Sequence, residues 1–263
     1  MPQRLCIFHY IGGKHNVVKK LLPLIPEHKI YVEVFGGAAN LLLNKPRSGV
    51  EVYNDIDGEL INLFLIVRDR RDEFVDRLRG VPYSRGLYYE WLNGSPPEDP
   101  VERAARFYYV MRCSFSGTRD RGWSFKRRAH RHAPDIFAAA LEKTGAIAER
   151  LKGVYIDCLD FRRCIKNWDE PETFFYLDPP YYGLNYYQFK FTESDHLDLR
   201  KILEETRGKW LLTYNDDPWV RDAYSGFHIR EVRQLKAASL VRHGGEREHF
   251  TNLIITNYPP PEV

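Results

Sequence analysis

The hydrophobic and polar positions along the chain predict strands that alternate with helices. Short runs rich in β-branched and aromatic residues predict strands, whereas apolar residues spaced three or four apart predict amphipathic helices. The predicted strands are residues 30–34, 50–54, 154–158, 173–177 and 210–214, the last three with the apolar character of buried strands. Helices are predicted at 38–44 and 57–67. Strands separated by helices indicate βαβ units and a mostly parallel sheet.

The middle and the end of the chain depart from this alternation. Residues 228–235 and 250–257 flank a loop with two adjacent glycines, which predicts a terminal antiparallel hairpin. From about residue 74 to residue 150 the pattern is helical, with breaks rich in proline, glycine and arginine. We therefore predict an α/β domain formed by residues 1–70 and 151–263, which a mainly helical insertion at 71–150 divides in sequence.

Composition narrows the class of protein without identifying it. The chain has 263 residues, of which 43% are hydrophobic and 29% charged, as in a globular protein with one sizeable core. A net charge of +3 does not by itself indicate nucleic-acid binding. The four cysteines lack the spacing of a zinc site, so we expect no metal. Neither a secretory signal nor a membrane-spanning apolar run is found, and we expect a cytoplasmic protein.

The first candidate site is a glycine-rich turn after the first predicted strand. Glu33 lies at the end of that strand, and Phe35, Gly36 and Gly37 follow it. Glycine lets the backbone approach a ligand closely, and the free N–H groups at the start of a following helix suit an anion. Such a turn is common in α/β proteins, so alone it indicates only a ligand site of unspecified kind.

An acidic position after the second strand points to a nucleotide-like ligand. Asp55 lies about 20 residues beyond the glycine turn, where acidic side chains hold ribose hydroxyls. The alternative is that Asp55 or Asp57 caps the helix that follows. The two aspartates can also divide these roles between them.

The third candidate site is Asp-Pro-Pro-Tyr at residues 178–181, directly after an apolar strand. Two prolines restrict φ, so the turn holds the Asp178 side chain and the Pro179 carbonyl in place. Tyr181 adds a ring on which a flat ligand can stack. The alternative is a stiff turn without a chemical role, but the position downstream of the other two motifs favours a catalytic site.

Together these motifs resemble the DNA adenine methylase family of amino-methyltransferases in its alpha arrangement. The similarity covers nearly the whole chain, through residues 10–14, 35–39, 54–55, 178–181 and 191–196. It implies a Rossmann-like methyltransferase fold with a mostly parallel seven-stranded sheet that ends in the antiparallel hairpin. It also implies methyl transfer from S-adenosyl-L-methionine to N6 of adenine in double-stranded DNA, which leaves S-adenosyl-L-homocysteine. Base flipping, direct in-line transfer and no metal are implied as well.

The resemblance implies roles for individual residues. The expected cofactor-binding residues are Tyr10 and Lys14 at the methionine end, Glu33, Phe35, Gly36, Gly37, Asp55, Asp160 and Asp178. Among them, Asp55 would hold the ribose hydroxyls and Asp160 would accept from the adenine amino group of the cofactor. Asp178 and the Pro179 carbonyl would accept hydrogen bonds from the target N6, and Tyr181 would stack on the flipped base.

A basic segment between residues 112 and 132 is the expected contact with DNA. Seven Lys or Arg lie there against one acid, Asp120, with three aromatic residues interleaved. Such a density requires solvation or matching phosphates, and inside an insertion of a DNA enzyme we favour phosphates over a merely solvated loop. The expected DNA-binding residues are Arg112, Arg119, Arg121, Lys126, Arg127, Arg128 and, in a second loop, Arg242.

The sequence departs from the family pattern at three places, of which two are mild and the third, residues 112–122, leaves the recognition sequence open. Val34 stands where proline is frequent, Ala39 replaces the second glycine, and residues 112–122 match only in part the Asn-Gly-rich segment of the GATC enzymes. We expect a monomer in the cytoplasm of a bacterial, archaeal or phage-infected cell. Its expected partners are double-stranded DNA and, within a restriction-modification pair, a cognate endonuclease.

Rival functions are weighed against the same motifs. Cytosine-N4 or RNA methylation uses the same scaffold, but cytosine enzymes more often have Ser before Pro-Pro, so Asp178 favours adenine. A nicotinamide oxidoreductase needs a fuller glycine fingerprint than residues 36–39 supply. A non-catalytic DNA-binding module would leave residues 178–181 without a purpose.

Overall fold

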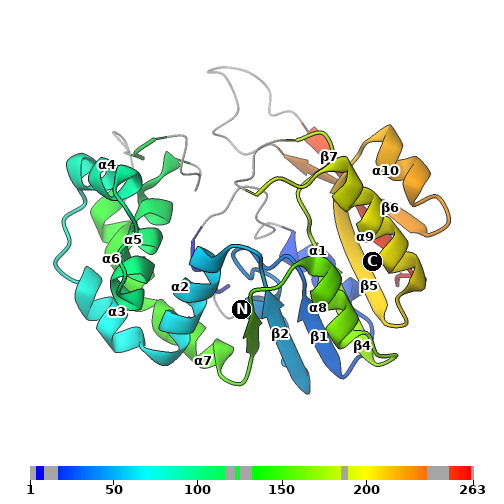
Figure 1. The fold of residues 1–263 in the computed structure, drawn as a ribbon, viewed down its shortest axis with the longest axis horizontal. Helices are drawn as coiled ribbons and strands as arrows, with labels where there is room; N and C mark the ends of the chain where they lie inside the picture. Colours follow the sequence, from blue (N-terminus) through cyan, green and yellow to red (C-terminus); the bar gives the residue numbers. More distant parts are fainter. Residues whose placement is uncertain are drawn as a thin grey trace. The chain divides into compact units, whose positions relative to one another are not determined.

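The chain folds into two compact units, each assembled from segments that are distant in sequence (Figure 1). The computed structural model describes residues 4–8, 17–115, 122–124, 132–184, 189–235 and 249–261. The first unit consists of residues 1–19, 37–46 and 57–158, and the second of residues 20–36, 47–56 and 159–263. The chain therefore passes from the second unit into the first between Gly36 and Gly37, within the glycine turn.

A seven-stranded sheet has the order β3-β2-β1-β4-β5-β7-β6. Its strands are β1 (Ile30–Glu33), β2 (Val50–Asn54), β3 (Tyr155–Asp157), β4 (Thr173–Leu177), β5 (Lys209–Asn215), β6 (His228–Leu235) and β7 (His249–Thr256). Strand β1 pairs in parallel with β2 and β4, and β4 pairs in parallel with β5. Strand β7 pairs antiparallel with β5 and β6. The predicted mostly parallel sheet with its terminal hairpin is confirmed.

Helices cover one face of the sheet in the second unit. They are α8 (Phe161–Trp168), α9 (Glu193–Glu205) and α10 (Pro218–Ala223), and Figure 1 shows α8 and α9 along the strands. Alternate strand residues such as Val32, Phe175 and Leu212 are fully buried against Leu199 and Val220. Burying each such side chain stabilises the fold by about 1.5–3 kcal/mol.

The first unit is mainly helical, as the sequence predicts for residues 71–150. Its helices are α2 (Gly58–Asp69), α3 (Arg71–Leu78), α4 (Arg85–Asn93), α5 (Pro100–Cys113), α6 (Ala133–Glu142) and α7 (Thr144–Leu151). Local sequence sets where they begin, because Ser84 and Asp99 each accept a hydrogen bond from a backbone N–H of α4 and α5. Within the described part of 71–150, strand-like pairing is limited to a bridge between Ser114 and Trp123.

Two of the predicted elements are wrong in kind or in burial. The helix predicted at 38–44 is a turn that leads only into the short 3-10 helix η3 (Leu42–Asn44). Gly37 and Ala39 have φ of 48° and 52°, and these left-handed residues cannot continue a right-handed helix. The strand predicted as buried at 154–158 is the three-residue β3, whose Tyr155 is 57% exposed. Because β3 lies at the edge of the sheet, its side chains are not enclosed on both sides.

Candidate active site

The predicted motifs of the second unit meet at the carboxyl ends of β1, β2 and β4. The strand order reverses between β1 and β4, since β2 follows β1 on one side and β5 follows β4 on the other. At this point the Val34 N–H donates to the Tyr176 carbonyl at 3.0 Å. The carboxyl-end crevice at such a reversal is where open α/β sheets bind ligands.

The glycine turn approaches the end of β2 too closely for any side chain. The Gly36 N–H donates to the Asn54 carbonyl at 2.8 Å. A Cβ on Gly36 would lie 2.1 Å from Cε2 of Tyr53, whose ring is fully buried. Gly36 is therefore required by the close packing of two chain segments, and it leaves the Phe35–Gly36 backbone beside the carboxyl end of β2.

Asn54 connects three segments of the site. Its side-chain Nδ2 donates to the carbonyls of Val34 at 2.9 Å and Leu159 at 3.0 Å, and its Oδ1 accepts from the Leu159 N–H at 2.9 Å. The residue is 1% exposed, so these bonds are shielded from water. Asn54 thereby fixes Asp55 and Asp160, each one residue away from a bonded position. Sequence reasoning placed Asn54 in a motif but gave it no role.

Asp57, and not Asp55, caps the helix after β2. The Asp57 side chain accepts from the Glu59 N–H at 2.9 Å and forms the N-cap of α2. The alternative in which Asp55 is the cap is therefore wrong. Asp55 lies between the end of β2 and the cap, and it is half-buried.

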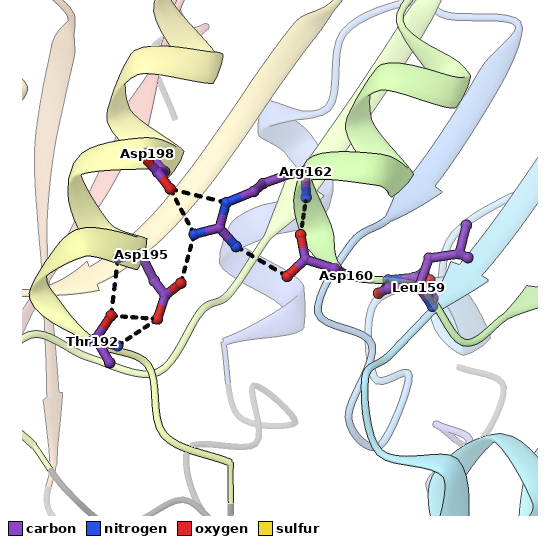
Figure 2. A network of polar contacts seen from close by, with 7 residues as sticks. Leu159, Asp160, Arg162, Thr192, Asp195 and Asp198 are labelled. Atoms are coloured by element: carbon purple, nitrogen blue, oxygen red, sulfur yellow. Dashed lines mark hydrogen bonds and ion pairs between the residues drawn. The ribbon is translucent and has the colours of Figure 1, made fainter.

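Asp160 belongs to a network of charges centred on Arg162, which Figure 2 shows. Asp160 caps α8 by accepting from the Arg162 N–H at 2.9 Å, and its other oxygen accepts from Arg162 Nη1 at 3.0 Å. The same guanidinium donates to Asp195 at 2.6 Å and to Asp198 at 2.7 Å on α9. Thr192 and Asp195 form a capping box at the start of α9. Arg162 thus links the predicted adenine contact to the helix that follows the catalytic motif.

Aromatic rings adjoin the glycine turn and Asp160. Phe35 lies 5.7 Å from both Phe161 and Phe191 between ring centroids, and Phe161 lies 5.4 Å from Phe191. Phe161 is buried, whereas Phe35 and Phe191 are half-buried. Partly exposed aromatic rings close in sequence to a carboxylate suit a flat heterocycle that carries donor groups.

The Asp-Pro-Pro-Tyr motif leaves β4 at the centre of the sheet. The Thr213 hydroxyl on β5 donates to Asp178 Oδ1 at 2.6 Å. Pro179 is buried, and Tyr181 is 9% exposed with its ring 6.0 Å from that of Tyr214. Asp178 is half-buried. The structure thus holds the Asp178 carboxylate from a neighbouring strand, a partner that sequence reasoning missed.

Glu33 lies on the same face of the sheet as Tyr176 and is buried, with 2% of its surface exposed. The Tyr31 hydroxyl donates to Glu33 Oε2 at 2.8 Å. The register pairs Glu33 with Tyr176 on β4. Burial, together with the charges of Asp178 and Glu33, holds the pKa of Tyr176 well above its ordinary value. This phenol therefore stays protonated near the two carboxylates.

Rings on α9 and α10 support the loop after the motif. Tyr182 stacks on Trp219 with ring centroids 4.3 Å apart, and its carbonyl accepts from Asn215 Nδ2 at 3.2 Å. His196 lies edge-on to Tyr182 at 5.1 Å and hydrogen-bonds to the Tyr214 hydroxyl. These contacts fix the backbone next to Tyr181.

We expect the buried His196 to make the protein acid-sensitive. Burial lowers the pKa of His196 from 6.5 to about 4, against an opposing effect of Asp195. Between these values only the unfolded chain binds the proton, so stability is fully present above pH 6.5 and falls as the pH drops toward 4. The loss approaches roughly 3 kcal/mol. Urea unfolding at pH 7, 5.5 and 4.5 measures it, and His196→Phe should flatten this part of the profile. An unchanged profile in that variant would assign the acid sensitivity to other groups.

Several predicted residues lie outside the part of the chain that the structure describes. They are Tyr10, Lys14, Arg119, Arg121, Lys126, Arg127, Arg128 and Arg242. Arg112 is described, half-buried in the last turn of α5. Among the described residues after α5, the Phe115 N–H donates to the Gly122 carbonyl and the Ser124 N–H donates to the Cys113 carbonyl.

Neither a metal cluster nor a spanning helix is present in the described ranges. There, no group of three or more His, Cys, Asp or Glu side chains could hold a metal ion. Across the same ranges, no helix has both the length and the apolar character needed to cross a membrane.

Comparison with known proteins points to one enzyme family. A family model described as D12 class N6 adenine-specific DNA methyltransferase matches residues 10–238. The chain is 24% identical over 260 residues to Type II methyltransferase M.CviBI of Paramecium bursaria Chlorella virus NC1A, covering 96% of this chain and 99% of that one. It is 26% identical over 279 residues to DNA adenine methylase of Escherichia coli (strain K12), covering 98% and 97%.

Proposed function

The chain belongs to the D12 class of N6 adenine-specific DNA methyltransferases, and we propose that the cluster at the carboxyl ends of β1, β2 and β4 performs the transfer. One observation carries this proposal. The Asp178 carboxylate, at the end of the central strand β4, is held by the buried Thr213 hydroxyl at 2.6 Å and followed by two prolines. A fixed acceptor at this place is what an amino group needs as it becomes positively charged.

The residues around the glycine turn fit S-adenosyl-L-methionine. Asp55 offers a carboxylate beyond β2 for ribose hydroxyls, and Asp160 offers one for the adenine amino group, beside the half-buried ring of Phe35. Gly36 and Gly37 keep side chains away from the turn, and Glu33 at the end of β1 is proposed as a further cofactor contact. Tyr10 and Lys14 are proposed for the methionine end. When bound, the cofactor supplies an activated methyl group, and S-adenosyl-L-homocysteine remains.

Asp178 and the Pro179 carbonyl are proposed to accept the two N–H bonds of the target N6. The lone pair of an aromatic amine is delocalised into the ring, and two fixed acceptors favour a more tetrahedral nitrogen whose lone pair is available. They stabilise the transition state more than the ground state, because positive charge grows on the nitrogen. The rest of the work is in-line positioning. Because the amino group is paired inside a duplex, the base must flip out, and Tyr181 is proposed to stack on it.

We expect Asp55→Ala to weaken cofactor binding. Each lost hydrogen bond from a ribose hydroxyl to the carboxylate should cost about 1.5–3 kcal/mol. Titration calorimetry with S-adenosyl-L-methionine measures the change. The matched control is Asp57→Ala, which removes the cap of α2 and should lower stability by about 1 kcal/mol while cofactor affinity is retained. Equal affinity in Asp55→Ala and the wild type would remove Asp55 from the site.

The basic segment that follows α5 is proposed to contact DNA. The described residues Phe115 and Gly122 are hydrogen-bonded to each other just after α5, whose last turn carries Arg112. Arg119 or Arg121 is proposed to contact a guanine edge, and residues 126–128 are proposed to contact phosphates. Loss of a phosphate contact should lower the salt slope of binding by about 1, whereas loss of a base contact costs about 1–3 kcal/mol at one position. If variants that lack each of these side chains all bind DNA like the wild type, the contact with DNA would have to be sought at Arg242 instead.

The biological setting follows from the substrate and the relatives. We propose that the chain acts as a monomer in the cytoplasm of a bacterial, archaeal or phage-infected cell, where its DNA is accessible. A relative named Type II methyltransferase supports a paired restriction endonuclease as a partner. Sedimentation of the protein with and without a DNA duplex tests the monomer.

Sequencing that detects modified bases tests the proposed function directly. Unmethylated DNA incubated with the protein and S-adenosyl-L-methionine should gain N6-methyladenine at one sequence context, and the Asp178→Ala variant should modify the same context about 10²–10³-fold more slowly. Modification at cytosine N4, or of RNA alone, would contradict the adenine assignment.

A further inference from the structure

The backbone of Asp178 is restricted, but its side chain has two rotatable bonds. The strand β4 precedes it and two prolines follow it, so its Cα has little freedom. Rotation of the carboxylate itself is broad and roughly two-fold in aspartates. A carboxylate that must meet a particular N–H bond therefore needs a partner that sets its plane.

Thr213 is placed to be that partner. The parallel register pairs Leu177 with Leu212, so the next residues, Asp178 and Thr213, lie side by side at the carboxyl ends of β4 and β5. The Thr213 hydroxyl is 2.6 Å from Asp178 Oδ1 and 3.4 Å from the Leu177 carbonyl. Its single proton is directed to the nearer, charged acceptor, which forms the stronger bond.

The Thr213 side chain is buried on an interior strand. Strand β5 is enclosed by β4 on one side and by β7 on the other, where Thr213 pairs with Ile254. The side chain is 2% exposed, so water does not compete for the hydroxyl. Threonine is branched at Cβ, which restricts χ1. A buried, β-branched donor in an interior strand holds its oxygen more firmly than a surface serine would.

We propose that Thr213 is a positioning residue of the methyl-transfer reaction, which sets the plane of the Asp178 carboxylate toward the amino group of the target adenine. The inference rests on the proposed role of Asp178 and adds a residue outside the recognised motif. It gives a role to the buried Thr213 hydroxyl, which lies between Leu212 and Tyr214 in β5.

Four variants distinguish loss of the Thr213 hydroxyl as a hydrogen-bond donor from a general loss of stability. Thr213→Val keeps the shape and removes the donor, and Thr213→Ser keeps the donor without the methyl group. Thr213→Ala differs from Thr213→Ser only by the hydroxyl, so this pair decides the question even if the valine variant does not fold. The matched control is Thr173→Val at the opposite end of β4, which also removes a buried hydroxyl, one that donates to the Trp168 carbonyl at 2.7 Å.

We expect Thr213→Val to lower the single-turnover rate by about 10²-fold, as a misplaced reacting group does. The Kd for S-adenosyl-L-methionine and for DNA, measured by calorimetry and by anisotropy, should stay within about two-fold, because the hydroxyl orients a catalytic group and binds neither ligand. Thr213→Ser should recover most of the rate, and Thr213→Ala should not. Thr173→Val should lose stability without losing rate.

Two results would overturn the inference. In one, Thr213→Val transfers methyl groups as fast as the wild type, or Thr213→Ala as fast as Thr213→Ser, while Asp178→Ala remains slow. The proposed function would then stand, and the positioning role of Thr213 would be wrong. In the other, Thr213→Ser is as slow as Thr213→Ala, which would assign the loss to packing. Full activity in Asp178→Ala would instead contradict the proposed function itself.

Discussion

Replacing Asp178 by alanine is expected to lower the rate of methyl transfer by about 10²–10³-fold, the usual cost of losing one fixed transition-state acceptor. Cofactor affinity should change little, because the ribose and adenine contacts are proposed for Asp55 and Asp160. Transfer of a radiolabelled methyl group under single-turnover conditions measures the rate, and calorimetry measures the affinity. The Thr213 hydroxyl then loses its acceptor in a buried site, so a moderate loss of stability should accompany the loss of rate.

The matched control for Asp178 is Asp216→Ala. Asp216 is an exposed carboxylate just beyond β5 that is paired with Arg221 at 2.6 Å. Its removal takes away a negative charge close to the same edge of the sheet, yet the rate should be unchanged. A comparable fall in rate for both variants would mean that the net charge of this edge matters, and not the acceptor at residue 178.

Replacing Gly36 by alanine is expected to lower both stability and cofactor affinity. The new Cβ would lie 2.1 Å from Tyr53 Cε2, and the fully buried ring has no open side into which it can move freely. Overpacking of this kind costs about 1–3 kcal/mol. Because Tyr53 precedes Asn54 and Asp55, a shift of its backbone also displaces the proposed ribose contact. Urea unfolding and titration calorimetry measure the two effects on one sample.

Gly226→Ala is the control for this substitution. A Cβ at Gly226, in the same unit, meets nothing within 4 Å, so stability and cofactor affinity should both be retained. If Gly36→Ala matched this control in both measurements, the close approach of the glycine turn to β2 would have no energetic consequence.

Local sequence determined where most regular elements lie and which motifs follow them. The segments predicted as strands at 173–177 and 228–235 are β4 and β6 with the same bounds, because strand patterns and turn residues act over short stretches. The motifs at residues 35, 55 and 178 each follow a predicted strand, and in a parallel sheet the carboxyl ends of the strands meet at one edge, so the sequence also predicts that these motifs lie at the same edge. Aspartate before an apolar periodic run likewise predicted a cap, and Asp57 provides it.

Only the tertiary structure decided which side chains orient the site. Asn54 bonds to Leu159, 105 residues away, and Asp178 bonds to Thr213, 35 residues away. These partners are set by strand order and register, which depend on the whole core and leave no periodic signal in the sequence. The same holds for Ala39, which adopts φ of 52° although isolated alanine avoids that region. Local propensity favoured a helix there, and the requirements of the surrounding fold outweighed it.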